Sequence, residues 1–93
     1  RTTEQYRKLY AALPAHIQQG VRDTCVIFDA DPNANSLRIH NLTANKRGQH
    51  QDGSISVSVT MKYRAIYVKA ADGMNVWYWI GTHADYDVFT GKK

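Results

Sequence analysis

The sequence predicts a small α+β domain in which a hairpin of two helices packs on a three- to four-stranded antiparallel sheet. Apolar residues recur at helical intervals in the first third of the chain and at the two-residue interval of strands further on. The 93 residues are enough for one compact core and too few for two, so we expect a single domain over residues 1–93.

Two amphipathic helices are predicted before the Asp31-Pro32 pair, which ends the helical pattern. The spacing from Thr2 to Gln5 is that of a capping box. The apolar stripe of the first helix then consists of Tyr6, Leu9, Tyr10 and Leu13. Pro14 suits the first turn of a second helix, because its missing N–H is not needed there. The apolar stripe of this second helix consists of Ile17, Val21, Cys25 and Phe28.

Two residues inside the second helix bear on its packing. Gly20 costs about 1 kcal/mol relative to alanine in a helix, and we expect it to let the first helix approach closely. Cys25 is the only cysteine and is expected in the core, since free cysteine is among the most buried residue types. A single cysteine cannot form an internal disulfide, which agrees with a reducing compartment.

Strands are predicted after the helices. Apolar and polar residues alternate over 37–40, which predicts the first strand. Further strands are expected over residues 55–59, 63–69 and 76–80. The last run is apolar on both faces, as expected of a central strand, and Gly81 is expected to end it.

Composition and charge restrict the classes of function. No apolar run approaches the roughly 20 residues of a membrane span, and no signal-peptide pattern is present, so a cytoplasmic location without membrane contact is expected. Lys and Arg number 12 against 8 Asp and Glu, and the net charge of +4 favours a polyanion or an acidic protein as partner. The motifs of NTPases, acyl hydrolases and glycosidases are missing from the sequence.

Four short motifs follow one another along nearly the whole chain. They are YRKLYAALP at 6–14, DP followed by SLR within 31–38, YRAIY at 63–67 and IGTHADY at 80–86. In this order they resemble the first helix, the helix exit, the Tyr-Arg strand and the Ile-Gly-x-His ending of the RelE/ParE superfamily of bacterial toxins. The resemblance implies a RelE-like fold. Members usually have a short strand before the first helix, and this sequence starts too late to show it, so we expect an uncovered sheet edge.

The resemblance also implies the toxin of a type II toxin-antitoxin module. Such a toxin enters the ribosomal A site and cleaves mRNA through attack by the RNA's own 2′-OH, and a cognate antitoxin silences it. This reaction needs a base, an acid and cations at the phosphate, and it requires no metal or other cofactor. The four histidines have no tight ligand spacing and predict no metal site. Two alternatives stay open: a ParE-like inhibitor of DNA gyrase without nuclease activity, and an inactive member that only binds its antitoxin.

His83 and Arg64 are the predicted catalytic residues. His83 matches the carboxy-terminal catalytic position of the family, and imidazole suits proton transfer, as acid or as base. The alternative is a structural role at the strand end. Arg64 matches the family's strand arginine and suits the phosphate. Alternation places Arg64 with Ile66 and Val68 on an otherwise apolar row, so it must be paired or face a cleft. A structural salt bridge is the alternative role.

RNA-binding residues are predicted in two places. The polar segment 43–53 predicts an exposed loop, where related toxins carry basic residues near the nucleotide. Here the loop offers Lys46, Arg47 and His50, and incidental charge on a solvated loop is the alternative. Near the carboxy terminus, Tyr86 and Phe89 either stack on an exposed base or close the core.

Overall fold

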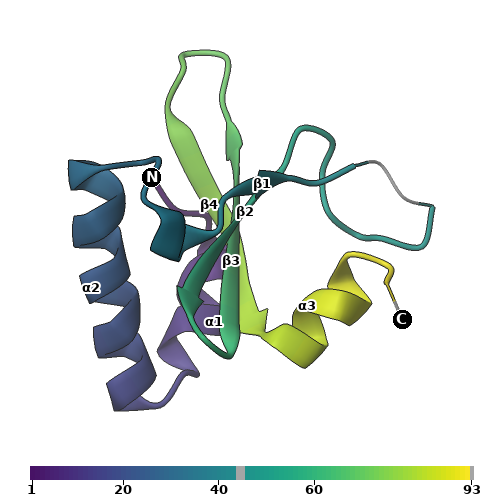
Figure 1. The fold of residues 1–93 in the computed structure, drawn as a ribbon. Coiled ribbons are helices and arrows are strands. Elements are labelled where there is room, and N and C mark those ends of the chain that lie inside the picture. Colours follow the sequence, from purple (N-terminus) through teal and green to yellow (C-terminus); the bar gives the residue numbers. More distant parts are fainter. Residues whose placement is uncertain (44–45, 93) are drawn as a thin grey trace.

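The structure is a computed structural model that describes residues 1–43 and 46–92 of the chain. Its elements are α1 (Glu4–Ala11), α2 (Ala15–Ala30), the 3-10 helix η1 (Asn35–Leu37), β1 (His40–Asn41), β2 (Ile55–Thr60), β3 (Tyr63–Lys69), β4 (Asn75–Thr82) and α3 (His83–Phe89). The strands form one antiparallel sheet in the order β1-β2-β3-β4 (Figure 1). The predicted fold class is therefore confirmed. No helix in the described part of the chain is long and apolar enough to cross a membrane.

The sheet is covered on both faces, which Ala65 and Ile66 of β3 show most directly. Neighbouring strand residues point to opposite faces. Ala65 packs in a cluster with Tyr6 of α1 and Val21 of α2. Ile66 packs in a second cluster with Tyr86 of α3. The helical hairpin therefore covers one face and α3 covers part of the other, as the separation of the helices in Figure 1 shows.

The start of α1 differs from the prediction by one residue. The N-cap is Thr3, whose Oγ1 accepts a hydrogen bond from the N–H of Tyr6 at 3.1 Å. Thr2 forms a parallel bridge with Trp77 of β4 instead. The N–H of Trp77 donates to the carbonyl of Arg1 at 2.9 Å, and the N–H of Thr3 donates to the carbonyl of Trp77 at 3.0 Å. An uncovered sheet edge was expected, but residues 1–3 cover the edge of β4 at Trp77.

Two predictions about α2 were wrong. Gly20 faces the sheet: a Cβ added there would lie 3.0 Å from Cγ2 of Thr60, so the close approach is to the end of β2 and not to α1. Cys25 is exposed and does not fill the core. Cys25 instead lines an apolar cavity together with Tyr6 and Tyr10 of α1.

The predicted first strand was also largely wrong. Its first residue, Leu37, ends η1 and is 1% exposed, packed with Val57 and Tyr67. Arg38 follows with φ of 46°, in the left-handed region. The chain therefore turns where continuous strand was expected, and β1 is limited to two residues opposite Ile55 and Ser56.

β4 is an edge strand in hydrogen bonding and not the predicted central strand, and it continues through Gly81 to Thr82. Its apolar character on both faces has a structural reason. Ile66 pairs with Trp79 and Tyr67 pairs with Trp77, so Tyr78 is an extra residue in the ladder, a β-bulge. Trp77 consequently packs on Phe28 of α2 at a ring distance of 5.5 Å, while Trp79 stacks on Phe89 of α3 at 4.9 Å.

Replacing Gly81 with alanine is expected to destabilise the fold. A Cβ on Gly81 would lie 2.7 Å from Cη2 of Trp79, whose ring is buried and stacked on α3. The expected cost is about 1–3 kcal/mol in the free energy of unfolding, measured with urea. The control is Lys69→Ala at the exposed end of β3, where a change within about 0.5 kcal/mol is expected. Equal stability of the two variants would contradict this packing.

Candidate functional site

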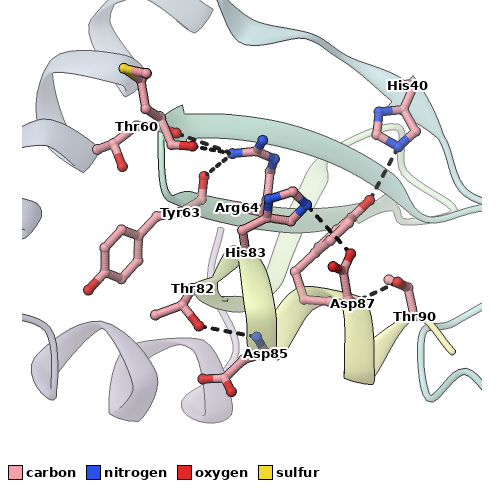
Figure 2. Close-up of polar contacts among 11 residues, drawn as sticks. His40, Thr60, Tyr63, Arg64, Thr82, His83, Asp85, Asp87 and Thr90 are labelled. Atoms are coloured by element: carbon pink, nitrogen blue, oxygen red, sulfur yellow. Dashed lines mark hydrogen bonds and ion pairs between the residues drawn. The ribbon is translucent and has the colours of Figure 1, made fainter. Parts of the chain in front are cut away.

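The predicted catalytic residues meet at the end of the sheet where β4 runs into α3. Arg64 of β3 lies opposite Gly81 of β4 in the antiparallel register, and His83 follows two residues later. The backbone N–H of His83 donates to the carbonyl of Lys62 at 2.7 Å, which fixes the start of α3 against the β2–β3 turn. Figure 2 shows the side chains of Arg64 and His83 at this same end of the sheet.

Arg64 is half-buried and bonded to the backbone of its own turn. Its Nη1 donates to the carbonyls of Tyr63 at 2.9 Å, Thr60 at 3.2 Å and Met61 at 3.5 Å. Arg64 also lines a surface cavity of about 370 Å³, together with Arg38. Among the described residues no ion pair includes Arg64, so its structural partners are carbonyls rather than a carboxylate. The Nη1 bonds leave Nε and Nη2 without a protein partner in the same part of the chain.

His83 is the first residue of α3, a helix that the sequence pattern did not predict. Its imidazole is 55% exposed, and its Nε2 lies 3.5 Å from Oδ1 of Asp87 one helical turn later. The Asp87 side chain is only 16% exposed. A carboxylate in this position restricts the orientation of the imidazole ring. Thr82 caps the helix through its Oγ1, which accepts from the N–H of Asp85 at 3.1 Å.

His40 is a site residue that sequence reasoning missed. Its Nε2 lies 3.2 Å from the hydroxyl of Tyr86, and its Nδ1 lies 3.3 Å from the carbonyl of Arg38 (Figure 2). His40 is exposed, on the α3 side of the sheet. The contact joins residues far apart in sequence, through a turn that the strand pattern did not predict, so no local signal could have found it.

The two aromatic residues of α3 belong to the core. Tyr86 is 2% exposed and packs at a ring distance of 6.3 Å from Trp79. Phe89 is half-buried and stacks on Trp79 with an angle of 19° between the rings. Lys92 places its Nζ 5.4 Å from the centre of the Tyr86 ring. This arrangement matches the core-closing alternative, and the buried ring of Tyr86 has no free face for a base.

The loop before β2 carries the remaining predicted residues, and residues 44 and 45 of it lie outside the described part. Lys46 and Arg47 are exposed. Nε2 of His50 lies 2.7 Å from the carbonyl of Thr43, and its ring lies so close to Gly48 that a Cβ there would be 2.7 Å away. His50 therefore holds the loop's shape, while its contact with RNA stays a prediction.

The loop is also attached to α3. The N–H of Gln49 donates to the carbonyl of Phe89 at 2.7 Å, and the N–H of Gln51 donates to the hydroxyl of Tyr78 at 2.9 Å. The basic loop and the helix that carries His83 are thereby joined.

Within residues 1–43 and 46–92, no three His, Cys, Asp or Glu side chains group together as metal ligands would.

The fold matches solved toxin structures over most of its length. YafQ from E. coli strain BL21(DE3) superposes with a TM-score of 0.70 at 14% identity, covering 92% of this chain and 93% of that one. The YoeB/ParE toxin from Agrobacterium tumefaciens gives 0.64 at 15% identity, covering 88% and 94%. The chain has a RelE/ParE-like toxin fold.

A third match is a complex. The RelB-RelE antitoxin-toxin structure from Methanococcus jannaschii gives a TM-score of 0.64 at 13% identity, covering 95% of this chain and 96% of that one. No family model matches the sequence, and no curated protein matches it. The similarity to known toxins is therefore carried by three-dimensional structure.

Replacing Thr82 with alanine is expected to loosen α3 and the position of His83. The variant loses the oxygen that caps the N–H of Asp85, at a cost of about 1 kcal/mol in the free energy of unfolding. Thr82→Ser keeps that oxygen and should retain most of the stability. Urea unfolding of both variants measures the difference, and an equal loss in the two would show that the cap does not hold the helix.

Proposed function

We propose that the protein is the toxin of a type II toxin-antitoxin module and a ribosome-dependent endoribonuclease that cleaves mRNA. The observation that carries the proposal is the meeting of His83, with Asp87 beside it, and Arg64 at one end of the sheet. A proton-transfer group beside a cation suits phosphodiester cleavage, whereas an inhibitor that only binds gyrase needs neither. The toxin fold is consistent with this role.

His83 and Arg64 have distinct parts in the proposed reaction. The RNA's 2′-OH attacks the adjacent phosphate, a 2′,3′-cyclic phosphate forms, and the 5′ oxygen of the next nucleotide departs. His83 takes or supplies one of the two protons, and Asp87 holds the orientation of its imidazole ring. Arg64 binds a phosphate oxygen through the nitrogens that its turn does not use.

His40 is the proposed second proton-transfer group. The reaction needs both an acid and a base, and His40 is the other exposed histidine held near α3. The hydroxyl of Tyr86 and the carbonyl of Arg38 orient its ring. In this proposal Tyr86 acts by positioning His40 and does not stack on a base.

The exposed basic loop supplies the proposed contacts with the RNA backbone. Lys46 and Arg47 lie on the loop that is bonded to the end of α3, and no base preference follows from phosphate contacts alone.

The proposed protein partner is a cognate antitoxin that covers this face, since a net charge of +4 favours an acidic partner. The reaction is placed in the cytoplasm, where translating ribosomes are.

The proposal predicts new mRNA ends in cells that make this chain without an antitoxin. Brief expression should produce cuts at a fixed position within codons, and these cuts should require translation. His83→Ala should lower their frequency about 10²–10⁴-fold, the range for loss of an acid or base. Mapping of mRNA 5′ ends by sequencing measures this directly.

His16→Ala is the matched control, because His16 is an exposed histidine in the first turn of α2 and makes none of the site's contacts. It should cut as the unchanged chain does. His40→Ala should cut as poorly as His83→Ala. Growth arrest with intact mRNA and broken DNA would refute the nuclease proposal and support inhibition of DNA gyrase. Unimpaired growth would support the other alternative, an inactive protein that only binds its antitoxin.

A further inference from the structure

The helices α1 and α2 enclose an apolar cavity of about 320 Å³ against the sheet. Its walls include four aromatic side chains, Tyr6, Tyr10, Phe28 and Trp77. Cys25 of α2 also lines the cavity and is exposed. The cavity is lined by Ala65 of β3 and by neither His83 nor Arg64, although the cavity that Arg64 lines is its neighbour and shares Thr24 and Val59 with it.

A cavity of this size leaves apolar wall atoms unpacked, which is unfavourable in a chain of 93 residues. Protein interiors are normally packed as densely as organic crystals, and wall atoms that face a void lose their dispersion contacts. Gly20 lets α2 approach Thr60 at the end of β2. Tyr10 of α1 is bonded to Gln18 and Arg22 of α2, and the cavity lies beside these contacts.

Water is poorly suited to fill the cavity, because the hydroxyls of Thr24 and Tyr10 in its walls are already bonded. The hydroxyl of Thr24 donates to the carbonyl of Gly20 or Val59, at 2.8 and 2.7 Å. The hydroxyl of Tyr10 accepts from Nη1 of Arg22 at 2.9 Å. A buried water needs two to four partners, and an apolar cavity without them stays dry and takes apolar molecules.

The hydroxyl of Tyr6 is available in the walls. Within residues 1–43 and 46–92, the hydroxyl of Tyr6 makes no hydrogen bond, although the residue is only 8% exposed. Burial, with smaller effects of Cys25 and Tyr10, raises the pKa of Tyr6 to about 12. Burial and the Asp29 carboxylate likewise raise the pKa of the Cys25 thiol. Both groups are therefore uncharged at neutral pH and suit an uncharged ligand.

We infer that this cavity binds a small neutral aromatic molecule of one or two rings, held between the aromatic walls and hydrogen-bonded to Tyr6. The volume is at the lower end of the range for small-molecule sites. The walls already show the tilted ring contacts that such a ligand would extend. Trp77 lies 6.5 Å from Tyr6 at 50° and 5.5 Å from Phe28 at 75°.

Indole is the probe for the test, and Cys25 reports on it. Titration of indole into the purified chain should raise the melting temperature with saturation. It should also slow alkylation of Cys25 by iodoacetamide, because the thiol borders the cavity. Tyr6→Phe should bind indole roughly fivefold more weakly, the loss expected for one hydrogen bond.

Cys25→Phe fills the cavity and should abolish indole binding, while Val26→Phe places the same ring on the outer side of α2, where Val26 is 69% exposed, and should bind normally. Equal binding by these two variants would overturn the inference. So would a melting temperature and an alkylation rate that indole leaves unchanged. If Cys25→Phe does not fold, the protection of Cys25 in the unchanged chain decides the question alone.

Discussion

The antiparallel register between β3 and β4 is the constraint on which the candidate site depends. It places Arg64 opposite Gly81, and the chain then needs only two more residues to reach His83. A slip of one residue would send every side chain of a strand to the other face of the sheet. The β-bulge at Tyr78 stabilises this register from both sides, because it turns Trp77 toward the helical hairpin and Trp79 toward α3.

The β2–β3 turn is the second part of the same arrangement. Its carbonyls accept from Nη1 of Arg64, and the carbonyl of Lys62 accepts from the N–H of His83. One short turn thus positions a cation from a strand and an imidazole from a helix. The two faces of the sheet are consequently different in character: charged and polar groups gather around α3, and an apolar cavity lies under the hairpin.

Sequence patterns predicted α1, α2 and the three long strands, because each has a periodic apolar face. They failed where tertiary contacts decide. The alternation of apolar and polar residues over 37–40 resembled a strand. In the structure Leu37 is buried at the end of η1, and Arg38 follows it in the left-handed region. The helix α3 has seven residues, too few for periodicity, although Thr82 three residues before Asp85 is a capping signal. His83 and Arg64 came from motif order, whereas the pairing of His40 with Tyr86 needed the structure.

The central claim is that this end of the sheet cleaves RNA through the 2′-OH, and the chemistry of the cut ends tests it most directly. Purified chain should be added to ribosomes translating a defined mRNA, and the upstream fragment should be analysed by mass spectrometry. A 2′,3′-cyclic phosphate on that fragment, with a 5′-hydroxyl on the downstream fragment, is the predicted result. A free 3′-hydroxyl with a downstream 5′-phosphate would contradict the mechanism proposed for His83 and Arg64.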